Sequence, residues 1–171
     1  MRVTNIHERQ LPLPPAEVGT LINSLASEDD RLWPGTMWPA MRFDRPLGVG
    51  AAGGHGPIRY SVEEFIPGQR VKFRFSGPRG FNGHHWFEVL PHGQASTLLR
   101  HALEMKTEGP AQLSWPLVFR WLHDACVEDS LSVGQTSLGL EPVVLSWSPW
   151  VRVLRWLLSG GSARPQQMLN K

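Results

Sequence analysis

Residues 70–75 read Arg-Val-Lys-Phe-Arg-Phe, an unbroken alternation of charged and apolar side chains. A period of two is typical of a β-strand that has one face in the core and one in water. The dipeptide Pro67-Gly68 forms a turn before this strand, and segments 57–66, 83–90 and 95–106 have strand-like patterns on either side of it. Because their connections have the length of hairpin turns, we expect an antiparallel sheet rather than βαβ units.

One long helix is predicted after the sheet. Ser114 is placed to cap a helix that runs from about Trp115 to Gln135, with Pro116 in its first turn. Val118, Leu122, Cys126 and Val133 form an apolar arc at helical spacing, and this arc is expected to face the sheet.

The segment before the sheet is predicted to begin with a strand over 3–11, a helix over 16–26 and a second short helical turn over 27–33. Residues 37–47 are expected to hold a further strand, and the glycine-rich stretch 48–56 a loop or a distorted edge. The predicted fold class is therefore α+β. A curved antiparallel sheet of about six strands wraps around a long C-terminal helix, with two short helices after strand 1.

The composition suits one globular domain with many large apolar rings. The chain has 171 residues, 41% of them hydrophobic, and its eight Trp and seven Phe need a core, a lined cavity or a contact surface. The net charge is only +2 and the basic residues are scattered, which argues against nucleic acid as a partner. With a single cysteine, no visible secretory signal and no run of roughly 18 apolar residues, a cytoplasmic protein is expected.

Several motifs accompany this order of elements: Leu13-Pro14-Pro15-Ala16-Glu17-Val18, Tyr60-Ser61-Val62, Pro67-Gly68-Gln69-Arg70-Val71-Lys72-Phe73, His85-Trp86-Phe87-Glu88-Val89, Thr97-Leu98-Leu99-Arg100-His101, and the helix stretch from Trp121 to Leu131. Together they resemble the START-like or SRPBCC superfamily, the helix-grip proteins, which includes polyketide cyclases and lipid-transfer domains. The resemblance covers about residues 1–138. We therefore expect a helix-grip domain over 1–138 and a Trp-rich amphipathic extension with a frayed end over 139–171.

The resemblance implies a hydrophobic cavity between the sheet and its last helix, and a family in which only some members are enzymes. The leading hypothesis is that the protein binds a small hydrophobic or amphipathic molecule, such as a lipid or a polyketide, without a cofactor. The residues expected to contact it are Tyr60, Phe73, Phe75, His85, Phe87, Leu99, His101, Leu103, Val118, Leu122 and Cys126.

His85 and His101 are the main candidates for polar contacts. A three-residue turn centred on Gly93 would pair His85 directly with His101 on the helix-facing side of the sheet. The two imidazoles would then hold a ligand carbonyl or hydroxyl, or act as a general base. The alternative is a pair of core histidines satisfied by backbone groups or by each other.

Asp129 is the third candidate, because it falls near the middle of the apolar arc of the long helix. A carboxylate there costs several kcal/mol unless it is paired or protonated. His85 or His101 could pair with it and complete an acid–base triad. The alternative is that the helix bends or frays first, so that Asp129 reaches water or caps a neighbouring segment.

Three other patterns do not indicate a functional site. Gly48, Gly50 and Gly53 match the pattern G-x-G-x-x-G of dinucleotide-binding loops. That motif requires a helix directly after the glycines, whereas a strand is expected here, so nucleotide binding is not expected. The histidines show no recognised metal-ligand spacing, so no metal site is expected. Cys126 is read as a small buried apolar residue.

The extension holds three of the eight Trp residues. Ser148-Pro149 suits a helix start, after which Arg152 and Arg155 form a cationic stripe among Trp and Leu. Such a helix suits packing on its own domain, a homodimer contact or peripheral contact with a membrane through Trp147, Trp150 and Trp156. Two alternatives to simple ligand binding thus stay open: a cofactor-independent polyketide cyclase or dehydratase, and a membrane-surface or partner-binding module that acts through this tail.

Overall fold

The computed structural model of the chain describes residues 1–160. Its main layer is an antiparallel seven-stranded sheet in the order β1-β7-β6-β5-β4-β3-β2. The strands are β1 (Arg2–Leu11), β2 (Arg42–Phe43), β3 (Ala52–His55), β4 (Ile58–Ile66), β5 (Arg70–Gly77), β6 (Phe81–His92) and β7 (Ser96–Thr107). The predicted α+β class and antiparallel sheet are confirmed. The frayed end predicted beyond Gly160 lies outside the described residues.

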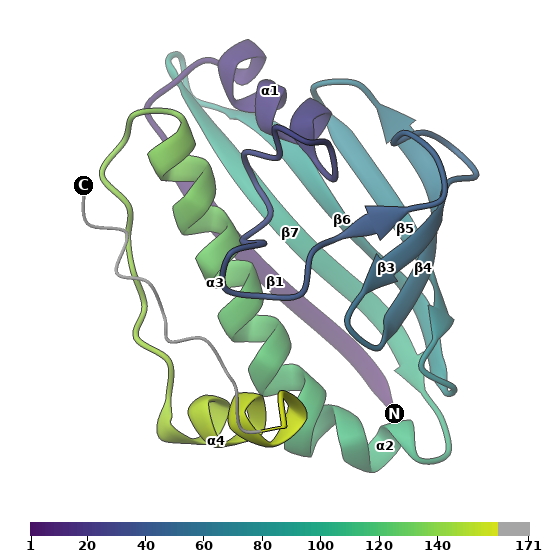
Figure 1. The fold of residues 1–171 in the computed structure, drawn as a ribbon. Helices are drawn as coiled ribbons and strands as arrows, with labels where there is room; N and C mark the ends of the chain where they lie inside the picture. Colours follow the sequence, from purple (N-terminus) through teal and green to yellow (C-terminus); the bar gives the residue numbers. More distant parts are fainter. Residues whose placement is uncertain (161–171) are drawn as a thin grey trace.

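One helical rod crosses the concave face of the sheet (Figure 1). It consists of α2 (Ala111–Ser114), η1 (Trp115–Phe119) and α3 (Arg120–Ser137). The rod begins one turn before the predicted start, and Ser114 makes no side-chain cap. Pro116 therefore lies inside the helix, where it cannot donate the usual backbone hydrogen bond. The chain adapts by widening into a π-turn, in which the Arg120 N–H donates to the Trp115 carbonyl.

Between β1 and β2 the structure has one short helix, α1 (Pro15–Ser24), so the prediction of a second short helix there is wrong. Its place is taken by a turn that the Asp30 carboxylate organises. This carboxylate accepts hydrogen bonds from the N–H groups of Ala26, Leu32 and Trp33, at 2.7, 3.0 and 2.8 Å. A side chain that bonds nearby backbone donors competes with helix formation.

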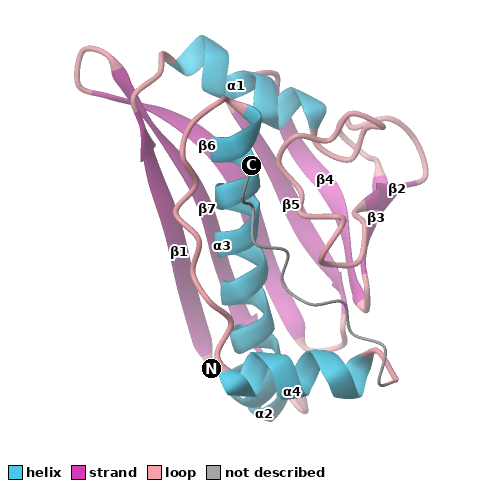
Figure 2. Cartoon of the chain, turned by 60° about the vertical axis from the view of Figure 1, so that its left-hand side comes forward, coloured by secondary structure: helices cyan, strands magenta, loops and turns pink. Residues whose placement is uncertain are grey.

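The C-terminal extension packs on the rod. Residues 139–148 run beside α3, where Ser132 Oγ donates to the Val143 carbonyl at 2.7 Å (Figure 2). The helix α4 (Pro149–Leu158) then begins at the predicted Ser148 cap, whose Oγ accepts from the Val151 N–H at 3.2 Å. No helix in residues 1–160 is long and apolar enough to cross a membrane.

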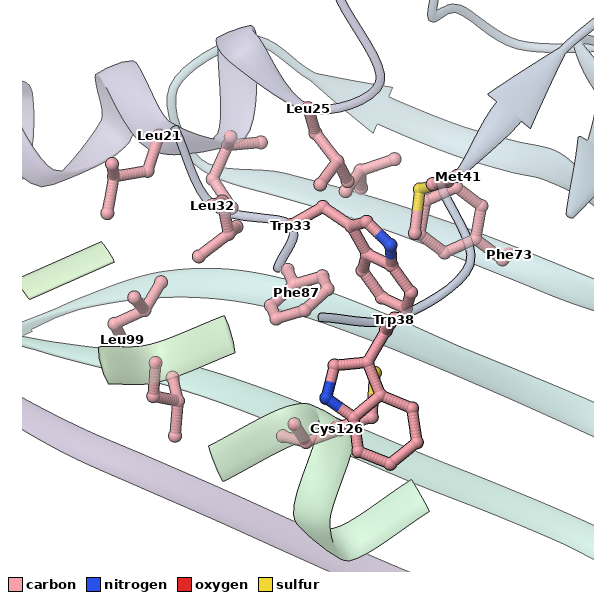
Figure 3. Close-up of a cluster of buried hydrophobic side chains, with 14 of the residues drawn as sticks. Leu21, Leu25, Leu32, Trp33, Trp38, Met41, Phe73, Phe87, Leu99 and Cys126 are labelled. Carbon is pink, nitrogen blue, oxygen red and sulfur yellow. The ribbon is translucent and has the colours of Figure 1, made fainter. Parts of the chain in front are cut away.

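The core lies between the concave face of the sheet and α1, α3 and the 32–41 loop (Figure 3). Leu21 and Leu32 enter from the helical side, and Phe73, Phe87 and Leu99 from the strands, all with no accessible surface. A void large enough for water would expose part of the side chains around it. The centre of the expected cavity is therefore filled by side chains.

Candidate functional site

The inward face of the sheet carries the residues predicted to contact a ligand. Alternation along β5, β6 and β7 turns Phe73 and Phe75, His85 and Phe87, and Leu99, His101 and Leu103 toward α3. Tyr60 joins them from β4. Val118, Leu122 and Cys126 lie on the rod; the first two are half-buried and Cys126 is buried. Burial raises the pKa of the Cys126 thiol well above its usual value, consistent with an unreactive core residue.

His85 and His101 lie side by side, but in a different register from the predicted one. His85 is opposite Leu103, and His101 is opposite Phe87. The hairpin loop consists of residues 93–95, so its centre is Gln94 rather than Gly93, and the pairing shifts by two residues. Because side chains alternate with a period of two, this shift leaves both imidazoles on the inward face. His85 Nδ1 and His101 Nε2 are 3.3 Å apart, within hydrogen-bond distance.

Both imidazoles are neutral at neutral pH. Burial lowers the pKa of His85 well below its usual value, and protonation of the neighbouring His55 and His123 would lower it further. Burial likewise lowers the pKa of His101, helped by His123 and His85. A neutral imidazole has one N–H and one lone pair. Two neutral rings joined by one hydrogen bond must therefore present one donor and one acceptor at their outer nitrogens, and the two roles exchange when the tautomers change.

The outer nitrogens of this pair are buried, and each lacks a hydrogen-bond partner among the described residues. They are His85 Nε2 and His101 Nδ1. A buried polar atom without a partner costs about 1–3 kcal/mol. A buried polar atom without a partner in the chain commonly has a functional role or meets a water molecule, an ion or a ligand.

Aromatic rings enclose His85. Phe73 and Phe75 stack on it, with ring centroids 4.8 and 4.9 Å away, and Tyr60 meets it edge-on at 4.8 Å. These rings fix the imidazole plane and keep the site apolar, while the ring nitrogens supply its polarity. Tyr60 is itself held by His55, whose Nδ1 lies 2.9 Å from the phenol oxygen. Burial lowers the pKa of His55 to about 3, so this ring is also neutral at neutral pH.

His123 extends the row of imidazoles from the sheet to α3. Its ring centroid is 5.1 Å from that of His101, and its Nδ1 lies 3.4 Å from Asp124 Oδ1. Burial lowers the pKa of His123, although the Asp124 carboxylate acts in the opposite direction. A neutral ring that donates from Nδ1 has its lone pair on Nε2, and this Nε2 is a third buried nitrogen without a partner. Sequence analysis did not single out His55 or His123. His123 lies in the helix stretch from Trp121 to Leu131, but no spacing links either residue to the pair.

A charged network lies between β1 and α3 beside the imidazole row. His7 contacts Glu128 Oε1 at 2.6 Å and Asp124 Oδ1 at 3.3 Å, and Arg9 donates to Glu128 Oε2 at 2.7 Å. Burial alone would lower the pKa of His7, but hydrogen bonds and charges from Asp124 and Glu128 outweigh it and raise this pKa to about 9. His7 is therefore protonated at neutral pH, and the network fastens the edge strand to the helix.

Asp129 does not join the histidines, so the predicted triad is wrong. Its Oδ2 accepts hydrogen bonds from Trp38 Nε1 at 2.7 Å and from Trp147 Nε1 at 2.8 Å. The Arg155 guanidinium lies over both indoles, 4.2 and 4.0 Å from their centroids. Asp129 thus anchors the C-terminal extension. Trp147 is only 6% exposed, so within the protomer it is not available for the membrane or homodimer contact expected of it.

Several inward-facing side chains are half-buried at one end of the interior. Phe75, Phe119 and Leu122 face inward but are half-buried. His55 and His123 are half-buried as well, and 19% of the His123 side chain is exposed. These residues surround the end of the interior next to the β3–β4 turn and η1. A separate hollow of ≈ 300 Å³ lies outside the sheet–helix interior, between Pro15, Pro67 and Pro91.

Comparisons with known proteins bear on the fold. No protein-family model and no curated protein matches the chain. Among solved structures, it is similar to norcoclaurine synthase from Thalictrum flavum in complex with dopamine and hydroxybenzaldehyde, with a TM-score of 0.61, 15% identity, and coverage of 84% of this chain and 90% of the other. A solution structure from Thermobifida fusca has a TM-score of 0.60 and 16% identity, and the match covers 83% of this chain and 97% of the other. CalU16 from Micromonospora echinospora has a TM-score of 0.56 and 15% identity, and the match covers 88% of this chain and 80% of the other. At these identities the likeness shows the fold alone: this chain has a helix-grip fold.

Proposed function

We propose that the protein binds a small, largely aromatic molecule that carries a hydroxyl or carbonyl group. The ligand would lie between the concave sheet and the rod, at the accessible end marked by Phe75 and Phe119. One observation carries the proposal: three neutral, inward-facing imidazoles each have a buried ring nitrogen without a partner among the described residues.

The chemistry of the site favours such a ligand. Phe73, Phe75 and Tyr60 offer ring faces and edges for an aromatic or conjugated molecule. The His85–His101 pair offers one donor and one acceptor, and the exchange of tautomers lets it meet a carbonyl as well as a hydroxyl. Norcoclaurine synthase, which shares the fold, was solved with two small aromatic molecules, dopamine and hydroxybenzaldehyde.

The proposal requires the ligand to displace or rearrange side chains. Phe73, Phe87 and Leu99 fill the centre of the interior, so a ligand would enter by the half-buried residues and move part of this packing. Rotation of Phe75 would open the path to His85, because it is the only one of the two rings stacked on this histidine that is half-buried.

A matched pair of ligands tests the proposal. Naphthol and naphthalene differ by one hydroxyl, so their binding to the wild-type protein isolates the hydrogen bond to the histidine row. We expect naphthol to bind about 3–10 times more tightly than naphthalene, the value of one net hydrogen bond. His85→Leu should remove this preference. His84→Leu is the control, because His84 is the adjacent residue on the opposite face of β6, where it contacts Glu63 at 3.0 Å.

Thermal unfolding of both variants checks that each is folded. Equal affinity of the wild type for the two ligands, or no uptake of either, would contradict the proposal. So would an equal loss of preference in both variants.

A cofactor-independent cyclase or dehydratase is the second candidate, and the neutral imidazole pair is what favours it. One outer nitrogen can take a proton from a carbon next to a carbonyl while the other gives a proton to the oxygen, and the shared proton then moves between the rings. Both rings end neutral, which suits a site where burial disfavours imidazolium. Exchange of solvent deuterium into an enolisable aryl ketone, lost in His101→Leu and kept in His84→Leu, is the expected sign. An exchange rate equal to that in buffer would contradict it.

A further inference from the structure

The helix α4 is apolar on the face that it turns toward water. Val151 and Leu154, 3% and 5% exposed, pack on the protein. The exposed side of α4 carries Trp150, Val153, Trp156 and Leu157, with exposures of 44%, 44%, 56% and 59%. A surface helix normally presents charged or polar residues on that side. Four large apolar side chains in their place indicate that something covers this face.

The apolar face continues onto the rod. Trp150 Nε1 donates to the Leu117 carbonyl at 3.0 Å, and Leu117 and Leu113 are 58% and 70% exposed. Figure 2 shows α4 beside α2 at the same end of the molecule. We call these six residues the α4–η1 face: Leu113, Leu117, Trp150, Val153, Trp156 and Leu157. Contiguous apolar surface on two elements is typical of a binding surface.

The charges around the α4–η1 face indicate which kind of partner it binds. Residues 109–119 contain no charged side chain, and α4 carries Arg152 and Arg155 but no acidic residue. A symmetric contact between two copies would bring like charges together with no carboxylate from this region to compensate. An anionic surface complements the same charges. Two exposed indoles beside cationic residues are also the composition of helices that lie at the lipid–water interface.

We propose that the α4–η1 face binds the surface of an anionic lipid bilayer. Trp150, Trp156 and Leu157 enter the interfacial region, and Arg152 at the edge of the face reaches the headgroups. Val151, Leu154 and Arg155 stay with the protein, since Arg155 is held over Trp38 and Trp147. The proposal goes beyond the binding of a small ligand and does not depend on it.

Vesicle co-sedimentation of the full chain tests the proposal. The vesicles are phosphatidylcholine alone, or phosphatidylcholine with about 30% phosphatidylglycerol. We expect binding to the anionic vesicles, a blue shift of tryptophan emission, and weaker binding at high salt because screening reduces the attraction. Binding to pure phosphatidylcholine should be several times weaker.

A valine-to-glutamate substitution on the α4–η1 face is compared with the same substitution elsewhere on the surface. Val153→Glu puts a carboxylate on the α4–η1 face and should weaken binding about tenfold or more, because it removes apolar burial and adds repulsion. Val49→Glu changes a valine that is 68% exposed in the loop between β2 and β3, away from the face, and should leave binding unchanged. Thermal unfolding confirms that both variants are folded.

Three results would overturn the proposal. The first is that the wild-type chain does not sediment with anionic vesicles, and the second is that both valine variants lose binding equally. The third is that sedimentation equilibrium without lipid finds a wild-type dimer that Val153→Glu converts to a monomer. The face would then be a contact between subunits.

Discussion

Replacement of Asp129 by alanine should release the anchor of the C-terminal extension. The carboxylate accepts hydrogen bonds from the Trp38 and Trp147 indoles, and all three residues are buried. Alanine would leave two indole N–H groups without their acceptor, at about 1–3 kcal/mol each. The expected loss in the free energy of unfolding is therefore about 2–6 kcal/mol, a large fraction of the stability of an ordinary domain.

Equilibrium unfolding in urea, followed by circular dichroism, measures this loss. Trp147→Phe keeps a ring in place but removes one donor, so it should cost about half as much, and the double variant should cost less than the sum because the two residues share one interaction. Asp29→Ala is the control: its side chain is 91% exposed, and its loss should cost less than about 0.5 kcal/mol. A cost below about 1 kcal/mol for Asp129→Ala would contradict the assigned role of this carboxylate, because the indoles would then have found other acceptors.

Three further predictions concern stability. Burial lowers the pKa values of His55, His85, His101 and His123. Below about pH 6.5 the unfolded chain therefore binds more protons than the folded one. As the pH is lowered further, the free energy of unfolding should fall by up to about 1.4 kcal/mol per pH unit for each imidazole that stays neutral in the folded state. His7 acts in the opposite direction: its pKa of about 9 adds stability that is complete below about pH 6.5 and is lost as the pH rises through 9. Urea unfolding over this range should therefore show a maximum near neutrality, and a flat profile on the acid side would contradict the assignment of neutral histidines. Ser148→Ala removes the cap of α4 and should cost about 1 kcal/mol in the same assay, whereas an unchanged midpoint would mean that the cap contributes nothing. Gly19→Ala would place a Cβ 2.2 Å from the Gly68 carbonyl oxygen and should lower the melting temperature by several degrees, while Gly35→Ala, with no atom nearer than 3.9 Å, should not.

The sheet and its rod could be predicted because their patterns are local. Val71, Phe73 and Phe75 alternate with charged residues, and the apolar arc from Val118 to Val133 repeats at helical spacing. The elements that failed depend on particular side chains. Asp30 replaces the second short helix by a hydrogen-bonded turn, and Pro116 lies inside the rod because a π-turn accommodates it.

The candidate site was only half visible from the sequence. His85 and His101 meet as expected, although in a register two residues away, because an even shift keeps both on one face. His55 and His123 come from β3 and α3, and only tertiary folding brings them to the same row. The partners of Asp129 are 91 and 18 residues away in the chain, a separation that no periodicity reveals.

Native mass spectrometry of the purified protein, followed by denaturation and identification of any small molecule released, shows whether the interior holds a ligand. We expect a retained or readily taken-up aromatic molecule at close to one per chain, lost in His85→Leu and kept in His84→Leu. A protein that carries no small molecule and takes up neither naphthol nor any other apolar aromatic probe would contradict it. The interior would then be a packed core, in which the unpartnered imidazole nitrogens serve no ligand.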